Sequence, residues 1–148
     1  MREILFRGKR IDNGEWVYGY YVTHSNVDRN ILHYISATTE KGMTFRKYYD
    51  VDPSTVGQYT GLTANGKKIF EGDIVKVEKN DHDWHEHDPN SYSIFAVDFD
   101  EGGYTAGDYF LQNWLWFDGF HGEVIGNIYD NPELLDNSEL LEDKNETD

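Results

Sequence analysis

Cysteine is absent from this chain of 148 residues. Its absence excludes a disulfide framework, a thiol nucleophile and a cysteine-ligated zinc site. Disulfides are rare in the cytoplasm, so the composition fits a cytoplasmic protein that needs no covalent staples.

Long apolar runs are also missing. The run nearest the start, Ile4-Leu5-Phe6, has three residues and is too short for the apolar region of a secretory signal. No stretch approaches the roughly 20 apolar residues that span a bilayer. We therefore expect a soluble protein that is not exported by a cleaved signal and does not associate with a membrane.

Basic residues are scarce in the second half of the chain. Residues 1–79 hold 12 Lys+Arg and 10 Asp+Glu, residues 80–148 hold one Lys and 18 Asp+Glu, and the net charge is −15. Because phosphate contacts need basic side chains, direct binding to nucleic acid is not expected. Three interpretations of the acidic half remain open: solubility, an acidic face for a basic partner protein, and binding of a divalent metal.

Aromatic residues, in contrast, make up 16% of the chain, with 11 Tyr, 8 Phe and 4 Trp. Rings in this number exclude a disordered chain and suit half-buried pleated sheets. The length predicts a single domain. The composition therefore favours a folded, mainly β protein.

The first fifty residues alternate in the manner of β-strands. A hairpin turn is indicated at residues 12–14 (DNG), and after it Trp16, Tyr18, Tyr20 and Val22 share one face of an extended segment. The pattern predicts an antiparallel meander over residues 1–50. Its four strands are expected at residues 4–9, 16–22, 31–37 and 43–49.

Residues 51–135 predict a small SH3-like bent barrel. Asn65-Gly66 and Gly72 supply turns that tolerate positive φ, and residues 74–77 form a strand rich in β-branched side chains. Further strands are expected at residues 93–100, 108–116 and 123–129.

Short helical turns are expected at two places, where a capping residue precedes a proline. Asp52 precedes Pro53, and Asn131 precedes Pro132. Proline suits the first helical position, and the Asp or Asn before it caps the free amides.

Three segments of this sequence carry a family resemblance. They read VDPSTVGQYTGL (51–62), NGKKIFEGDIV (65–75) and VIGNIYDNPELL (124–135), and the opening MREILFRG (1–8) fits with them. Together they resemble the YopX family. The resemblance implies a protein encoded by a bacteriophage or prophage that acts in the cytoplasm of the bacterial host, and it implies no particular activity.

The predicted organisation is one YopX-like β domain over residues 1–135, with the meander in 1–50 and the barrel-like part in 51–135. An acidic tail follows over residues 136–148.

The polar segment at residues 80–91 is the one candidate metal site. His82, His85 and His87 are suitable ligands for zinc, nickel or manganese, with carboxylates beside them. The segment lacks the spacing of a zinc-protease helix, and no second cluster supplies remote ligands. A loop of this composition is also simply solvated, so both interpretations stay open.

The aromatic run at residues 109–120 is the best candidate contact surface in the sequence. Trp114, Trp116 and Phe120 are its large anchors, and aromatic residues are enriched at protein interfaces. Burial of these rings in the core is the alternative.

The sequence thus predicts a phage or prophage accessory protein that binds a partner or assembles with itself. The partners considered are a basic host or phage protein and further copies of the chain in a homo-oligomer. No catalytic residue and no cofactor are predicted. The alternative is a metal-binding module or metal-dependent hydrolase centred on residues 82–87.

Overall fold

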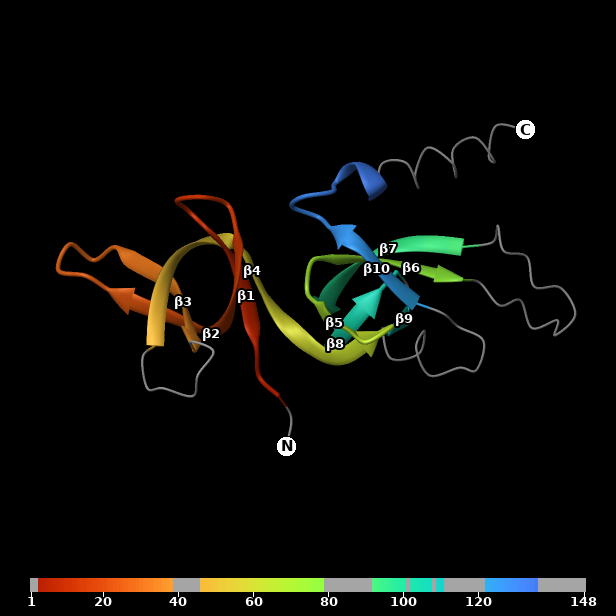
Figure 1. Ribbon diagram of the computed structural model, residues 1–148, viewed down its shortest axis with the longest axis horizontal. Helices are drawn as coiled ribbons and strands as arrows, with labels where there is room; N and C mark the ends of the chain where they lie inside the picture. The colour runs from red at the N-terminus through yellow and green to blue at the C-terminus, as the bar shows by residue number, and fades with distance from the viewer. Residues whose placement is uncertain are drawn as a thin grey trace, which may run out of the picture. The chain divides into compact units, whose positions relative to one another are not determined.

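The computed structural model describes residues 3–38, 46–78, 92–100, 102–107, 109–110 and 122–135. In these ranges the chain forms ten strands and one helical turn at residues 133–135 (Figure 1). Every pairing with a described register is antiparallel. The predicted mainly β fold is confirmed.

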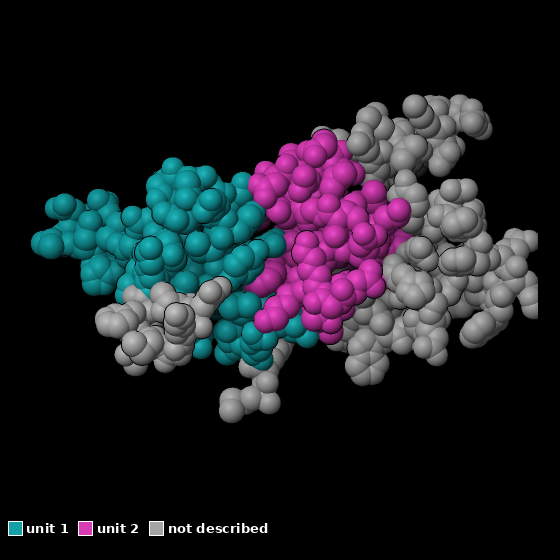
Figure 2. All heavy atoms as spheres, viewed as in Figure 1, with its two compact units in different colours: residues 1–61 teal, residues 62–148 magenta. Residues whose placement is uncertain are grey.

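The chain divides into two compact units, Met1–Gly61 and Leu62–Asp148 (Figure 2). We call them unit 1 and unit 2. The division into residues 1–50, 51–135 and 136–148 stays a prediction. The strands are β1 (Phe6–Arg10), β2 (Trp16–Ser25), β3 (Ile31–Thr38), β4 (Arg46–Ala64), β5 (Lys67–Phe70), β6 (Asp73–Glu78), β7 (Tyr92–Asp100), β8 (Gly103–Ala106), β9 (Tyr109–Phe110) and β10 (Gly122–Asn127).

Unit 1 is a ring of four strands, β1, β2, β3 and the first part of β4. β2 pairs with β1 through residues 16–19 and then with β3 through residues 20–25. β4 pairs with β3 and then with β1, which closes the ring. Closure leaves no free edge among these four strands. The ring therefore combines the strands predicted as a meander with residues 51–58 of β4, which the sequence analysis placed in the barrel-like part.

Apolar side chains and aromatic rings pack inside unit 1. Ile35 and Val51 are 0% and 1% exposed. The backbone at Gly8 approaches Val51 so closely that a Cβ atom there would lie 3.2 Å from it. Phe6 and Tyr21 add rings with centroids 6.0 Å apart. Glycine on β1 therefore makes room for packing inside the ring.

The helical turn predicted after Asp52 is wrong, because these residues lie within β4. The register with β1 jumps there, from Arg7 opposite Gly57 to Lys9 opposite Asp52. The extra residues form an irregularity in the strand, as β-bulges do. The Asp52 carboxylate still accepts a hydrogen bond from the amide of Ser54 at 3.0 Å, so the capping interaction forms without the helical turn. Pairing with β1 outweighed the local helical preference.

Unit 2 contains a five-stranded sheet in the order β10-β6-β7-β8-β9, and the hairpin of β5 with the end of β4. The turn of this hairpin is Asn65-Gly66, with φ of 51° and 78°, as the sequence predicted. Its core combines residues of β4 to β8. The buried members are Ala64, Ile69, Val75, Val77, Val97 and Ala106.

Two of the family-like segments meet in unit 2. The carboxylate of Asp73, 2% exposed, accepts a hydrogen bond from the amide of Phe70 at 2.7 Å. Gly72, with φ of 88°, donates its amide to Val97 and accepts at its carbonyl from Ile128, at 2.9 and 2.8 Å. The turn before β6 and the turn after β10 are thus bonded together, so these segments build scaffold.

A helical turn at residues 133–135 confirms the prediction for this segment. Asn131 takes the predicted capping position, because its carbonyl accepts from the amide of Leu134 at 3.1 Å, but its side chain bonds elsewhere. Its carboxamide oxygen accepts from the amide of Asn127 at 3.3 Å, and its own amide donates to the Asn127 carbonyl at 2.8 Å. The side chain closes the preceding turn, which competes with capping for the same oxygen.

Candidate functional site

The site residues predicted from the sequence lie outside the described residues. This applies to the metal candidates His82, His85 and His87, and to the contact candidates Trp114, Trp116 and Phe120. Both assignments stay predictions. Within the described ranges, no group of three or more His, Asp or Glu residues is arranged to hold a metal ion.

Unit 1 presents a second aromatic surface on the outside of its ring. Tyr18 and Tyr20 on β2 are 48% and 50% exposed, and Tyr48 on β4 is 57% exposed. Tyr34 on β3 is half-buried beside them. We call Tyr18, Tyr20, Tyr34 and Tyr48 the tyrosine face. Exposed rings gathered on one sheet face are uncommon where no contact is made.

The strand register places these side chains on one side of the sheet. Tyr20 lies opposite Ser36, which lies opposite Tyr48. In the next outward-facing row Tyr34 lies opposite Asp50. Directly paired residues of antiparallel strands project to the same face, so the two rows are neighbours on one surface. The Tyr34 and Tyr48 rings meet edge to face, with centroids 6.4 Å apart and planes at 80°.

Ser36 lies at the centre of the tyrosine face. It is 1% exposed, and its hydroxyl has no hydrogen-bond partner in the described part of the chain. Native proteins satisfy almost all buried polar atoms, since leaving one unsatisfied costs about 1–3 kcal/mol. A hydroxyl left in this state is therefore an unusual feature of the surface.

Beside Tyr18, two basic side chains pack on one aromatic ring. The guanidinium carbon of Arg7 lies 4.6 Å from the centre of the Trp16 ring, and the Lys9 ammonium lies 5.6 Å from it. Arg7 is opposite Tyr18 in the register. Cations at these distances are attracted to the face of an aromatic ring. The Trp16 ring is thus already occupied by the chain's own cations.

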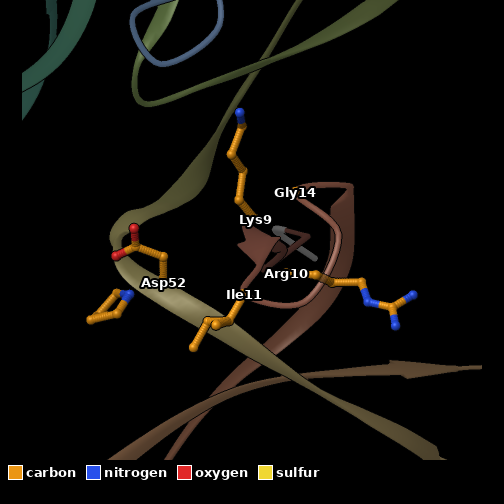
Figure 3. A pocket seen from close by; sticks show the side chains of 6 residues that line it. Lys9, Arg10, Ile11, Gly14 and Asp52 are labelled. Atoms are coloured by element: carbon orange, nitrogen blue, oxygen red, sulfur yellow. The ribbon is translucent and has the colours of Figure 1, made fainter.

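A hollow of about 380 Å³ opens at the turn after β1 (Figure 3). Figure 3 shows the Lys9 and Arg10 side chains extending in different directions from it. The residues that line it are Lys9, Arg10, Ile11, Gly14, Asp52 and Pro53.

The charged groups around this hollow are engaged in local bonds. Arg10 bonds Asp12 at 2.6 Å, which raises the pKa of the guanidinium and lowers the pKa of the carboxyl. Hydrogen bonds from the Ser54 hydroxyl and amide lower the pKa of Asp52. The polar groups therefore serve the turns and do not converge on a ligand.

Tyr21 and His33 form a polar pair on neighbouring strands. The Tyr21 hydroxyl bonds the Nδ1 atom of His33, and the two rings stack with planes at 13°. Burial raises the pKa of Tyr21. The pair links β2 to β3, so we assign it a structural role.

The tyrosine face was not identified as a site from the sequence. The sequence did contain a pattern that indicates this face, because Trp16, Tyr18 and Tyr20 alternate on one face of a strand. The same alternation is produced by a buried face and by an exposed one. The closure of the four strands into a ring leaves these tyrosine side chains exposed, and the alternation of residues along one strand does not predict that closure.

The fold and surface define a class: a small mainly β protein with a ring-closed first unit and an exposed aromatic face. A family model described as YopX protein matches residues 5–136. The chain belongs to the YopX family, which confirms the resemblance found in the sequence.

Among solved structures, the chain is similar to the crystal structure of protein EF1440 from Enterococcus faecalis. The TM-score is 0.53 and the identity 21%, over 91% of this chain and 99% of that chain. At this identity the likeness shows a shared fold. The comparison with curated proteins found no match. In the part of the chain that the structure describes, no helix has the length and apolar character needed to cross a membrane.

Proposed function

We propose that this YopX-family chain is a non-enzymatic binding protein and that the tyrosine face is its contact surface. The observation that carries the proposal is the half exposure of Tyr18, Tyr20 and Tyr48 on one side of a closed sheet. Tyrosine supplies a large contact area at a low cost in conformational entropy. The closed set of strands also holds the tyrosine side chains in place before binding, which reduces the free-energy cost of association.

The partner that we propose is a basic host or phage protein. The chain has a net charge of −15, so two copies repel each other while a basic protein is attracted. Self-association through the same face is the competing outcome and would make the chain a homo-oligomer.

The biological setting that we propose is a phage or prophage accessory role in the cytoplasm of the bacterial host. It rests on the family and on the resemblance described above. An acidic surface that accelerates encounter with a basic protein suits this setting.

The test compares the intact chain with a Tyr20→Ser/Tyr48→Ser variant. Proteins captured from host lysate at low salt are identified by mass spectrometry, then purified and titrated against both chains. We expect the double substitution to weaken binding by at least tenfold, because aromatic anchors dominate interface energies. Phe99→Ser is the matched control, since Phe99 is an exposed aromatic residue of unit 2, 53% exposed.

Unchanged binding in the double variant would remove the tyrosine face from the contact. Sedimentation velocity examines the competing outcome. A purified chain that forms a dimer or larger species, and becomes a monomer in the double variant, would assign the face to self-assembly and would refute the basic partner.

A further inference from the structure

We infer that the tyrosine face binds an arginine side chain of the partner, in a cage formed by Tyr20, Ser36, Tyr48, Tyr34 and Asp50. This inference rests on the proposed function and specifies the chemistry of its partner. The five residues come from three adjacent strands of the ring. They combine aromatic faces, one buried hydroxyl and one exposed carboxylate.

The spacing between strands leaves room for a cation to stack between two tyrosine side chains. Tyr20 and Tyr48 stand on β2 and β4, with Ser36 on the strand between them. Two strand spacings of about 4.8 Å separate their backbones by about 10 Å. A planar guanidinium between two rings needs about 7 Å, that is, two contacts of about 3.5 Å. The side chains therefore have room to flank it.

The same attraction already operates elsewhere in unit 1. Arg10 lies 4.7 Å from the centre of the Tyr49 ring and Lys47 lies 5.3 Å from it, as Arg7 and Lys9 do at the tryptophan. Among the described residues, no cation stacks on Tyr34 or Tyr48. These two rings are therefore available to a cation from outside the chain.

The hydroxyl of Ser36 is the second observation that points to a ligand. It is buried in the row between Tyr20 and Tyr48, and among the described residues it has no hydrogen-bond partner. A guanidinium carries five N–H donors, and its entry would supply the hydrogen bond that the hydroxyl lacks. The cost of the unsatisfied group is then recovered on binding.

Asp50 completes the cage with a negative charge. It is exposed, it lies opposite Tyr34, and it follows Tyr48 by two residues on the same face of β4. Its carbonyl accepts a hydrogen bond from the amide of Ile11 at 3.0 Å, which fixes its backbone. A carboxylate accepts two parallel bonds from one guanidinium. Lysine offers neither the plane nor the paired donors, so arginine is preferred.

The experiment titrates the full-length chain with a synthetic peptide in which arginine alternates with glycine. Peptides with lysine or citrulline in place of arginine are the comparison, and binding is measured by calorimetry and by backbone NMR shifts. We expect citrulline, which has lost its charge, to bind at least about tenfold more weakly. The lysine peptide is expected to bind several-fold more weakly. Shifts should concentrate at residues 20, 36, 48 and 50.

Substitutions in the chain assign the effect to the cage. Asp50→Asn and Tyr48→Leu are each expected to weaken the arginine peptide by about 3- to 10-fold. Tyr48→Phe keeps the ring and should restore most of the affinity. Asp52→Asn is the charge-matched control on the same strand, and Phe99→Leu is the aromatic control, because Phe99 is exposed and lies outside the tyrosine face. Neither control should change the affinity.

Equal binding of all three peptides would overturn the inference, as would equal weakening by Asp50→Asn and Asp52→Asn. The proposed function is tested separately with the purified partner. If the partner is lost in the Tyr48→Leu variant while arginine shows no advantage over citrulline, the face is a contact surface and the arginine cage is wrong. Urea unfolding midpoints within error of the wild type establish that each variant is folded.

Discussion

The absence of a side chain at Gly19 lets two strands of unit 1 approach each other closely. Gly19 is the last residue of β2 to pair with β1, and Tyr20 is the first to pair with β3. A Cβ atom at position 19 would collide with the carbonyl oxygen of Ser36. Glycine at such a corner permits an approach between strands that no other residue permits.

The first prediction is that Gly19→Ala destabilises the protein by about 1–3 kcal/mol, the usual cost of forcing extra volume into a packed site. Urea unfolding followed by circular dichroism measures it. Gly14→Asn is the control, since no atom lies within 4 Å of a Cβ there and asparagine tolerates its φ of 72°. Equal unfolding midpoints for Gly19→Ala and the wild type would show that the corner relaxes freely.

The carboxyl group of Asp52 is expected to make the stability of the protein depend on pH in the acid range. Its hydrogen bonds with Ser54 lower its pKa from 3.8. A carboxyl with a depressed pKa in the folded state adds stability above the unfolded value, near pH 4, and this stability is lost as pH falls through the folded pKa.

We expect Asp52→Asn to flatten the fall in melting temperature between pH 5 and pH 2. Asparagine keeps an acceptor for Ser54 but does not titrate. Melting curves across this range, referenced to pH 7, provide the measurement. If the variant and the wild type lose stability in parallel, the bonds with Ser54 do not contribute to acid sensitivity.

At the scale of elements, closure of the ring depends on an irregular stretch of β4. Where the register with β1 jumps, the Thr55 hydroxyl takes the place of a strand carbonyl. It accepts from the Lys9 amide at 2.9 Å and donates to the Asp52 carbonyl at 2.6 Å. Thr55 is 6% exposed, so both bonds are partly sheltered from water. The side chain thus completes the ladder at the bulge.

Thr55→Val is expected to lower stability by about 1–3 kcal/mol, because it removes the acceptor of a partly sheltered amide. Thr55→Ser keeps the hydroxyl and should lose less. Hydrogen exchange at the Lys9 amide localises the effect, and it should accelerate in the valine variant and not in the serine variant. Equal exchange in both would show that the hydroxyl is not needed for closure.

At the scale of the whole molecule, most acidic residues and the tyrosine face belong to different parts of the chain. The tyrosine face belongs to unit 1, whereas 18 of the 28 acidic residues lie in residues 80–148. Charges that are not part of a contact accelerate encounter, while the residues of the contact set the rate of dissociation. The two regions are therefore separable by kinetics.

Replacing the Asp and Glu residues of 136–148 by Asn and Gln should slow association with a basic partner. It should also reduce the dependence of that rate on salt, because screening then has less charge to act on. Stopped-flow measurements at low and high salt test this. Tyr48→Leu is the counterpart, which should change dissociation and leave association alone. An association rate that is unaffected by the tail substitutions would exclude the tail from steering.

Sequence patterns predicted the structure correctly where the conformation of a segment depends on its own residues. The strand predicted at residues 16–22 lies within β2, and the turn at Asn65-Gly66 has the positive φ values expected of it. The segment after Asp52 failed because its cap and proline favour a helix while β1 pairs with it across the ring. The predicted sites at residues 82–87 and 114–120 lie outside the described residues, so they stay predictions.

The sequence by itself determined the β class, the turns and the uneven charge, because alternation, turn residues and composition are local properties. Only the tertiary structure decided which of the alternating rings remain exposed and that Ser36 is buried among them. It also brought Gly72 against Ile128, from segments far apart in the chain. Burial and proximity depend on which strands pair, and pairing is a property of the whole chain.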